Sequence, residues 1–307
     1  MMKKANKITS IDVIILNFES YLDTINCVKY LQKQEKIDLN ILIVDNCSSN
    51  KSYDILKDIY LEIKNIEVIL SEKNGGYAYG NNFGLHHLEK KNTDFIVISN
   101  NDIMIKDTLL LFKMAEEYKK LNKPAFIAPL MHDNGEISKM SAWKIPRFID
   151  DLKGSLFILD FFFRDEDFYR GRQIYNTDHL SKTKPVDCLA GSFFMGVKKV
   201  FFDMGLLDEN TFLYMEESII GIKVKRLGLN NYLLHNLNYN HLSSQTISNH
   251  LSFIKMHKYA FKSKIYFHKA YLKSSNSKIF LLKSLFEVWK IESYFVRKIK
   301  IYLSVKK

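Results

Sequence analysis

The stretch TDFIVISNNDIMI, residues 93–105, joins a short apolar run to a polar end, and it decides the fold predicted for the whole chain. Its centre, residues 95–98 (FIVI), is the continuous apolar pattern of a strand buried on both faces. Two amides and a carboxylate, Asn100, Asn101 and Asp102, follow at once. Because open α/β sheets bind ligands outside the carboxyl ends of their strands, we expect Asp102 to lie at a ligand-binding edge.

Similar apolar stretches recur along the first half of the chain, with helical patterns between them. The predicted strands are residues 11–18, 40–46, 66–70, 94–99 and 125–129, and the predicted helices are roughly 21–35, 51–64, 78–91 and 106–121. This alternation is typical of an α/β fold with a mostly parallel central sheet flanked by helices. Residues 140–185 are less regular and rich in aromatic and charged side chains. We expect them to form an insertion or a flap over a cleft.

Composition limits the class of protein. With 307 residues, 47% of them apolar, the chain is long enough for one catalytic-sized unit with a sizeable core. Its three cysteines, Cys27, Cys47 and Cys188, have no paired spacing, which argues against a disulfide framework or a zinc site. The pattern favours a protein of the reducing cytosol.

The apolar segments are too short to span a membrane. The run at residues 11–18 contains Asp12 and has no small-residue cleavage site, so we interpret it as the first strand and not as a signal peptide. No segment reaches the roughly 18 uninterrupted apolar residues of a spanning helix. We therefore expect a cytoplasmic protein, with attachment only at a membrane surface as the alternative.

The positive charge is concentrated at the C-terminal end. The formal net charge is +11, yet residues 251–307 hold 14 Lys or Arg against two Glu, so residues 1–250 are close to neutral. A helix over residues 279–302 would place three basic residues opposite an apolar face: Lys283, Lys290 and Arg297 against Leu281, Leu285, Val288, Trp289, Phe295, Val296 and Ile299. Such a helix either lies on an anionic membrane or packs on the core with its basic face in water. Nucleic acid is not indicated, because no binding motif accompanies the charge.

Two further loops follow predicted strands. Asp45 and Asn46 end the second strand, where a carboxylate can accept hydrogen bonds from a base or sugar, or simply form a turn and cap. Residues 72–85 contain Gly75, Gly76 and two more glycines, which favour close backbone approach and amides free for phosphate. Asp102 itself is an oxygen ligand suited to a hard divalent ion.

Together these segments resemble the family 2 glycosyltransferases of the GT-A fold, particularly bacterial enzymes similar to rhamnosyltransferases. The resemblance rests on IDVIILNFES (11–20), ILIVDNCSSN (41–50), EKNGGYAYGNNFGL (72–85), FIVISNNDIMI (95–105), the block CLAGSFF to KVKRLG (188–228) and HLSS (241–244). It covers roughly residues 10–245 with the order of motifs preserved. Each motif alone is weak evidence for the family, but coincidence does not explain all of them occurring in the family's order.

The resemblance implies a GT-A catalytic domain over residues 1–250 and a basic helical tail over 251–307. Its nucleotide-sugar half would be about 8–130 and its acceptor half 131–250. The implied reaction moves a sugar from dTDP-rhamnose or a UDP-sugar to a saccharide hydroxyl, often lipid-linked, in cell-surface polysaccharide synthesis, with inversion. The implied donor-binding residues are Asn17, Asp45, Asn46, Gly75, Gly76, Asn81, Asn100 and Asn101.

The chemistry requires a cation and a base. A departing diphosphate needs its charge neutralised, so Asp102, with His241 as a second ligand, is predicted to bind Mg²⁺ or Mn²⁺. The attacking hydroxyl needs a proton acceptor, for which Glu217 is predicted and Glu216 is the alternative. Alternatively, both acids only cap the start of a helix, where the exposed amides favour negative charge.

Some positions depart from the family pattern. Asn100 replaces the first acid of a D-x-D motif, Ile219 replaces an acid after the Glu pair, and Asn50 replaces the last Asp of D-N-A-S-x-D. The first two keep open a non-catalytic GT-A-like carbohydrate-binding or scaffold protein. A sugar-nucleotide pyrophosphorylase is disfavoured, because the first strand lacks its Gly-rich loop and Lys. The sequence leaves the donor, acceptor, linkage and oligomeric state open.

Overall fold

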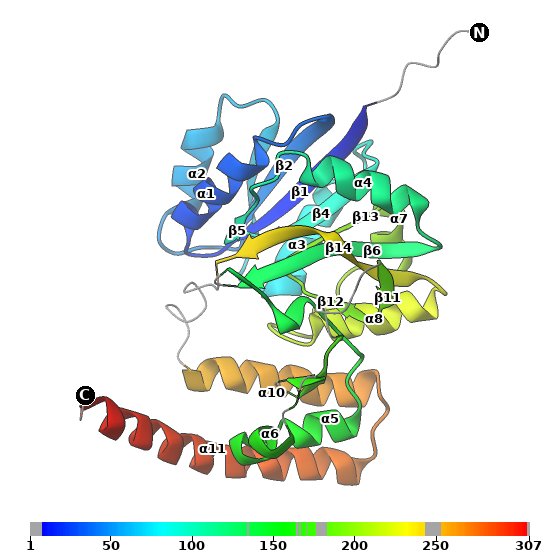
Figure 1. The fold of residues 1–307 in the computed structure, drawn as a ribbon. Helices are drawn as coiled ribbons and strands as arrows, with labels where there is room; N and C mark the ends of the chain where they lie inside the picture. Colours follow the sequence, from blue (N-terminus) through cyan, green and yellow to red (C-terminus); the bar gives the residue numbers. More distant parts are fainter. Residues whose placement is uncertain are drawn as a thin grey trace.

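The polypeptide folds around one mixed sheet, shown in Figure 1. The computed structural model describes residues 8–133, 135–163, 165, 167–169, 171–175, 183–242 and 253–305. Within them the sheet has ten strands, eight of them in the order β11-β14-β6-β13-β4-β1-β2-β3, with β5 paired to β14 and β7 to β6. The strands are β1 (Thr9–Asn17), β2 (Ile37–Asp45), β3 (Ile66–Leu70), β4 (Phe95–Asn100), β5 (Ile103–Met104), β6 (Pro124–Asp133), β7 (Glu136–Ile137), β11 (Lys184–Val186), β13 (Phe193–Gly196) and β14 (Asn230–His241).

The predicted α/β fold is confirmed, with one difference in the sheet. Strands β3, β2, β1 and β4 are parallel neighbours, and β6 and β14 run in the same direction. Between β4 and β6, however, lies β13, which is antiparallel to both. Residues 193–196 come from the second half of the chain, so local patterning of the first half carried no signal of this insertion.

Helices cover both faces of the sheet because successive strand residues point to opposite sides. In β1, Val13 and Ile15 face one core cluster and Ile14 faces the other. Helices α1 (Tyr21–Leu31), α2 (Ser52–Tyr60) and α4 (Leu110–Lys120) cover the first face, and α3 (Tyr77–His87), α7 (Lys198–Asp203) and α8 (Glu216–Arg226) cover the second. The four predicted helices of the first half are all present, each ending earlier than expected by one to four residues.

Polar residues gather where the strands that share one direction end. Asn17, Asp45 and Asn100 close β1, β2 and β4, and the pairing places Asn17 beside Asp45 and Leu16 beside Asn100. His241 closes β14, where it pairs with Ile103 of β5. One edge of the sheet therefore collects the side chains that the sequence predicted for a binding site.

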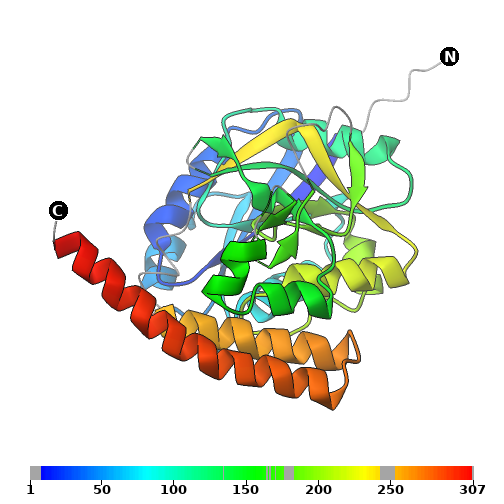
Figure 2. The ribbon, with the colours of Figure 1, turned by 60° about the horizontal axis from the view of Figure 1, so that its bottom comes forward.

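The chain ends in a helical hairpin below this domain. The sequence predicted one amphipathic helix, and the structure has two, α10 (Phe253–Ala270) and α11 (Asn276–Val305), which lie antiparallel (Figure 2). From the irregular region, α5 (Phe148–Lys153) and α6 (Phe157–Phe163) lie against this hairpin, whereas the small strands β8 (Ala142–Trp143), β9 (Phe168–Tyr169), β10 (Arg172–Gln173) and β12 (Cys188–Leu189) form two separate pairs. No helix in the described ranges has the length and apolarity needed to cross a membrane.

Candidate active site

On the donor side, a closed hydrogen-bond network joins the ends of β1 and β2. The Asn17 amide donates to Asp45 at 2.6 Å, the Ser48 backbone N–H donates to the other Asp45 oxygen at 2.8 Å, and Thr24 donates to Asn17 at 2.7 Å. Asn101 joins the network by donating to Thr24 at 3.1 Å. Burial raises the pKa of Asp45. Because Asp45 is fully buried and both oxygens are paired, a direct contact with a base or sugar would require this loop to open.

The glycine-rich loop is closed by protein contacts. Gly76 has a φ of +89°, and a Cβ there would stand 2.1 Å from the Phe212 carbonyl oxygen, so a side chain is excluded. The Gly76 N–H donates to Asn74 at 3.1 Å and the Tyr77 N–H donates to Phe212 at 3.0 Å. The prediction that this loop keeps amides free for phosphate is therefore wrong for Gly76 and Tyr77. The predicted close backbone approach is present, but the backbone at Gly76 approaches Phe212, in the segment that leads to α8.

Two other residues predicted to bind the nucleotide-sugar donor, Asn46 and Asn81, differ in whether their polar atoms are hydrogen-bonded. Asn46 donates to Asn74 and to the Gly76 carbonyl, at 3.1 and 3.2 Å, and so fastens the end of β2 to the glycine-rich loop. Asn81, inside α3, donates to the Tyr77 carbonyl at 2.9 Å, while its Oδ1 is buried with no hydrogen-bond partner among the described residues. Their contacts with a donor, like those of Gly75 and Asn100, stay predictions.

Asp102 and His241 meet at the same edge, although they are far apart in the sequence. The β5–β14 pairing brings them together, and Asp102 Oδ1 lies 3.2 Å from His241 Nε2. Neither Asp102 oxygen, nor His241 Nε2, has a correctly aligned hydrogen bond to any described residue. A buried polar atom without such a bond calls for an explanation, because burial removes its water.

The pair fits a divalent cation. Burial alone would lower the pKa of His241, but the carboxylates of Asp102 and Asp133 raise it above its ordinary value. A cation bound at Nε2 would therefore have to displace a proton, so its binding should strengthen as the pH rises. Two ligands of one small octahedral ion are held about 3 Å apart, which is close to the observed spacing. Within the described residues no group of three or more His, Cys, Asp or Glu forms a complete cage. Mg²⁺ and Mn²⁺ do not need one, since water and phosphate oxygens supply the remaining ligands.

On the acceptor side, the two predicted acids follow a strained turn. Glu216 and Glu217 are the first residues of α8, and the residues before them, Tyr214 and Met215, have left-handed φ values of 71° and 74°. Consecutive non-glycine residues in this region cost energy and are typical of functional sites. The exposed amides of the helix start favour negative charge at this position.

The environment separates the roles of the two acids. Burial, and then the neighbouring Glu217, raises the pKa of Glu216 to about 8, so Glu216 is mostly protonated at neutral pH. Burial also raises the pKa of Glu217, but Arg172 opposes this increase. Glu216 is only 5% exposed, whereas Glu217 is half-buried beside Gly191, where a Cβ would meet its Oε1 at 2.9 Å. Glu217 is therefore the better proton acceptor of the two.

A short segment connects the acid pair with the cation ligands. Gly191 contacts Glu217, and the next residue, Ser192, shares a 2.7 Å hydrogen bond with the Tyr239 hydroxyl. Burial and, to a lesser extent, the nearby Asp102 raise the pKa of Tyr239. Residues 191–192 therefore link the surroundings of Glu217 to Tyr239, whose pKa responds to Asp102.

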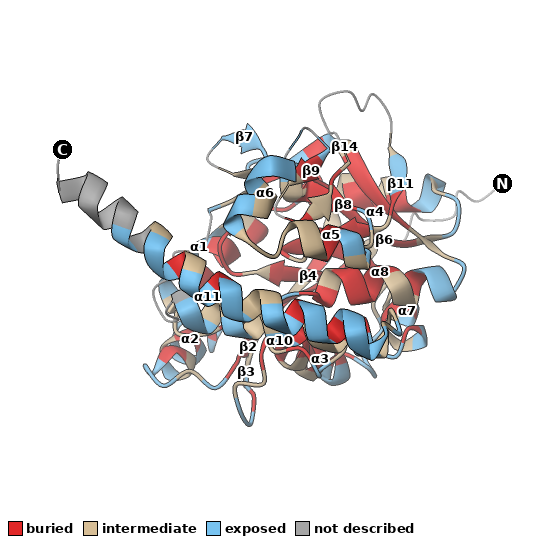
Figure 3. Cartoon of the chain, turned by 90° about the horizontal axis from the view of Figure 1, so that it is seen from below, coloured by how far each residue is buried: buried red, intermediate tan, exposed pale blue. Residues whose placement is uncertain are grey.

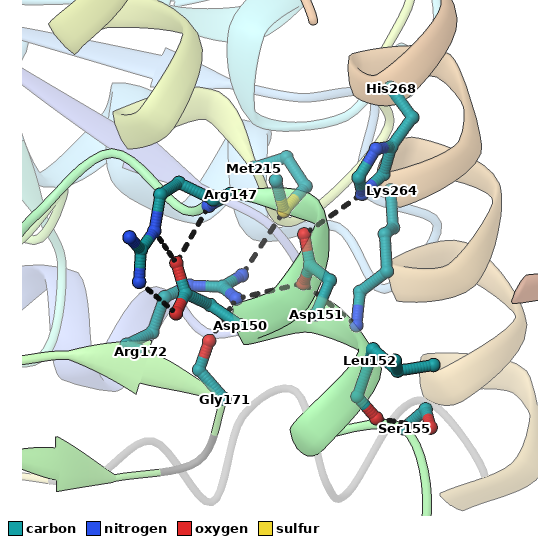
Figure 4. A network of polar contacts seen from close by, with 10 residues as sticks. All are labelled: Arg147, Asp150, Asp151, Leu152, Ser155, Gly171, Arg172, Met215, Lys264 and His268. Atoms are coloured by element: carbon teal, nitrogen blue, oxygen red, sulfur yellow. Dashed lines mark hydrogen bonds and ion pairs between the residues drawn. The ribbon is translucent and has the colours of Figure 1, made fainter. Parts of the chain in front are cut away.

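Sequence reasoning missed a buried charged network beside the acids (Figure 4). Asp151 of α5 has no exposed surface and contacts Arg172 at 3.1 Å, Lys264 at 3.0 Å and His268 at 3.1 Å. Burial alone would raise the pKa of Asp151, but Lys264 and Arg172 hold it well below its usual value. Arg172 also donates to the Met215 sulfur at 3.1 Å. The network therefore ties α5, β10 and α10 to the strained turn before α8.

The departures from the family pattern have structural reasons. Ile219 is buried in a cluster with Met215 and Phe267 of α10, so an acid at this position would lose that apolar contact with the hairpin. Asn50 accepts from the Ser52 N–H at 3.1 Å at the start of α2. Neither position is available for the role that the family pattern would give it.

Comparison with known proteins identifies the family. Residues 12–201 match the family model described as Glycosyl transferase family 2, and the chain belongs to this family. A stretch of 114 residues is 25% identical to "Glycosyltransferase GlyG" of Streptococcus pneumoniae serotype 4, and it covers 36% of each protein. The chain therefore matches only about a third of the length of this curated relative.

Solved structures show the same fold at low sequence identity. GalNAc-T7 with UDP, GalNAc and Mn²⁺ is similar with a TM-score of 0.56 and 14% identity, over 85% of this chain and 48% of that one. The mannosyltransferase PcManGT of Pyrobaculum calidifontis, in complex with GDP-Man and Mn²⁺, has a TM-score of 0.56 and 8% identity, over 87% and 65%. S. aureus TarS has a TM-score of 0.50 and 14% identity, over 87% and 74%. These likenesses establish the GT-A fold.

Proposed function

We propose that the protein is an inverting glycosyltransferase that moves a sugar from a nucleotide-diphosphate donor to a saccharide hydroxyl. The observation that carries this proposal is the buried Asp102 and His241 pair at the sheet edge, in which both Asp102 oxygens and His241 Nε2 lack aligned hydrogen bonds to described residues. The nucleotides and Mn²⁺ named with two of the similar structures support the donor class and a divalent cation. The resemblance to rhamnosyltransferases favours dTDP-rhamnose, with a UDP-sugar as the alternative.

Asp102 and His241 are the residues that would hold Mg²⁺ or Mn²⁺. A cation bound there supplies charge neutralisation for the departing diphosphate. The donor-side network of Asn17, Asp45 and Asn101 keeps the ends of β1, β2 and β4 in register beside it. In this way the fold sets the position of the cation ligands without using them for its own hydrogen bonds.

Glu217 is the proposed general base. Its carboxylate takes the proton of the acceptor hydroxyl while that oxygen bonds to the anomeric carbon and the bond to the diphosphate breaks. One displacement of this kind inverts the anomeric centre and needs no protein nucleophile. Glu216, protonated beside it, does not compete for the proton. The acceptor class is a cell-surface saccharide, lipid-linked or free, reached from the cytoplasm.

Thermal unfolding with nucleotides and Mn²⁺ tests the site directly. We expect one of UDP, dTDP or GDP to raise Tm in the presence of Mn²⁺ and to lose most of that effect with EDTA. Asp102→Ala should abolish the metal-dependent shift, whereas Asp107→Ala, which removes a nearby surface acid paired with Lys113, should keep it. An unchanged shift in Asp102→Ala would contradict the assigned cation site.

A donor-hydrolysis assay separates the enzyme from a non-catalytic GT-A-like binding protein. We expect slow, Mn²⁺-dependent release of nucleotide diphosphate from the donor that stabilises the protein best. Metal-dependent donor binding with neither hydrolysis nor transfer to any saccharide acceptor would instead support the binding protein.

A further inference from the structure

Helix α11 carries two apolar stripes, of which its packing uses only one. Ile279, Leu282 and Trp289 are buried, with the spacing of a single helix face. Ile291 follows Trp289 by two residues, about 200° around the helix, and is 62% exposed. It belongs to an exposed stripe that consists of Phe280, Leu281, Val288, Ile291, Tyr294 and Phe295. Figure 3 shows from below that much of α11 is exposed.

Helix α6 extends this exposed stripe. Its sequence is FILDFFF and none of its residues is buried; Phe161 is 76% and Phe162 71% exposed. The Glu292 carboxylate of α11 accepts from the N–H groups of Phe157 and Ile158 at 2.7 and 2.8 Å, and the Phe157 ring centroid lies 6.3 Å from that of Trp289, so α6 lies beside α11. We call the exposed apolar side chains of α6 and of the α11 stripe the apolar platform.

Exposed apolar side chains gathered on two neighbouring helices mark an interaction site, and the charge around them indicates the partner. The segment that carries α10 and α11 has 14 Lys or Arg against two Glu, and Lys283 and Lys298 are exposed on α11 itself. Pairing two copies through α11 would bring two strongly basic segments together, which like-charge repulsion opposes. An anionic lipid surface satisfies both the apolar and the basic side chains.

We propose that the apolar platform docks the protein on an anionic membrane leaflet, with α6 and α11 lying in the interface. A helix that lies flat needs only one apolar face, so the absence of a spanning helix from the described residues is compatible with this arrangement. The inference goes beyond the proposed function. It concerns a surface that shares no residue with the candidate active site, so vesicle binding and sugar transfer can fail independently.

Co-flotation of the full chain with vesicles tests the proposal. We expect partition onto phosphatidylglycerol/phosphatidylcholine vesicles and at least about tenfold weaker partition onto pure phosphatidylcholine. Phe161→Glu combined with Ile291→Glu should reduce anionic-vesicle partition more than about tenfold, because two anions replace two apolar anchors. The matched control is Leu22→Glu with Leu61→Glu. These two residues, in α1 and directly after α2, are 63% and 68% exposed and lie outside the apolar platform, so this variant should bind like the wild type.

A second pair of variants tests the charge. Lys283→Glu with Lys298→Glu should weaken partition onto anionic vesicles about tenfold or more, and Lys57→Glu with Lys64→Glu should not. Substitutions are preferable to deleting residues 275–307, because deletion removes the buried Ile279, Leu282 and Trp289. Circular dichroism and thermal unfolding establish that each variant is folded. If the double platform variant does not fold, Phe161→Glu alone carries the test.

Three results would overturn the proposal. The first is a wild type that does not bind anionic vesicles at about 0.15 M salt. The second is equal binding by the platform variant and its control. The third is a stable dimer in light scattering that Phe161→Glu with Ile291→Glu dissociates, which would assign the platform to a second copy of this chain.

Discussion

Two groups of polar side chains at the same edge of the sheet differ in whether the fold satisfies them. Asn17, Asp45 and Asn101 are buried and hydrogen-bonded to one another or to their neighbours. Asp102 and Glu216 are also buried, but they keep oxygens with no aligned hydrogen bond to described residues. Folding does not gain from leaving such atoms unpaired. We therefore expect the first group to hold the ends of the strands together and a ligand to bind at the second group, while the donor contacts predicted for Asn17, Asp45 and Asn101 stay predictions.

The largest effect should come from Glu217→Gln, which keeps the shape of the side chain but removes its basicity. We expect kcat for sugar transfer to fall by about 10²–10⁴-fold while the nucleotide-induced Tm shift is retained. Because the pKa of Glu217 is raised, wild-type activity should increase with pH through a value above the ordinary Glu pKa, and the variant should lose this increase. An equal loss in Glu216→Gln would assign the base to Glu216.

Asp45→Ala should show the cost of breaking the first group. It leaves the Asn17 amide and the Ser48 N–H unpaired in the interior, so the free energy of unfolding should fall by about 3 kcal/mol in denaturant titration. Asp38→Ala, at an exposed position of the same strand, should have little effect. A variant of normal stability that no longer binds donor would instead place Asp45 in contact with the nucleotide.

Glu216→Gln should stabilise the protein in a pH-dependent manner. The folded-state pKa of Glu216, about 8, is above its ordinary value of 4.5, so its contribution to stability is complete below pH 4.5 and is lost as the pH rises through 8. Glutamine does not ionise, so the variant should be more stable than the wild type by about 1–3 kcal/mol at pH 8 and equal at pH 4.5. Thermal unfolding at both pH values measures this difference, with exposed Glu62→Gln as the control. Equal stabilities at pH 8 would contradict the buried, raised pKa.

The smallest effect on stability should come from Asp102→Asn without metal. Neither Asp102 oxygen has an aligned hydrogen bond to lose, and relief of the buried charge offsets loss of the 3.2 Å ion pair with His241, so the free energy of unfolding should change by less than about 1 kcal/mol. The same denaturant titration used for Asp45→Ala gives a direct comparison. A loss as large as that of Asp45→Ala would place Asp102 in the first group and remove the contrast between the two groups.

The first half of the fold was predictable because its signals are local. Continuous β-branched runs gave the strand 66–70 with its observed limits and the others within a few residues at each end, apart from β6, which runs to Asp133. The insertion of β13 was not predictable, since residues 193–196 pair with β4 and β6 across long separations in the chain. The predicted tail helix is present, but its predicted single apolar face is divided, because Trp289 is buried while Val288 and Phe295 of the same face stay exposed.

The sequence predicted the types of residue at the site better than the interactions that each of them makes. Asp102, His241 and Glu217 were identified from motif positions, and their roles stay predictions. Asp45 and Gly76 were expected to contact the donor; in the structure Asp45 accepts from Ser48 and the Gly76 N–H donates to Asn74, and their donor contacts stay predictions. The sequence did not indicate that Arg172 lies beside the acids, because its partner Asp151 is in a region without periodic pattern.

The sequence by itself determined the α/β class, the polar ends of the strands, the acid pair and the basic C-terminal end, because these depend on residue type and short-range spacing. The tertiary structure decided which polar atoms are paired, which of two adjacent glutamates is protonated, and which apolar stripe of α11 is covered. These depend on desolvation and on contacts between residues far apart in the chain, and such contacts form only when the strands and helices pack together.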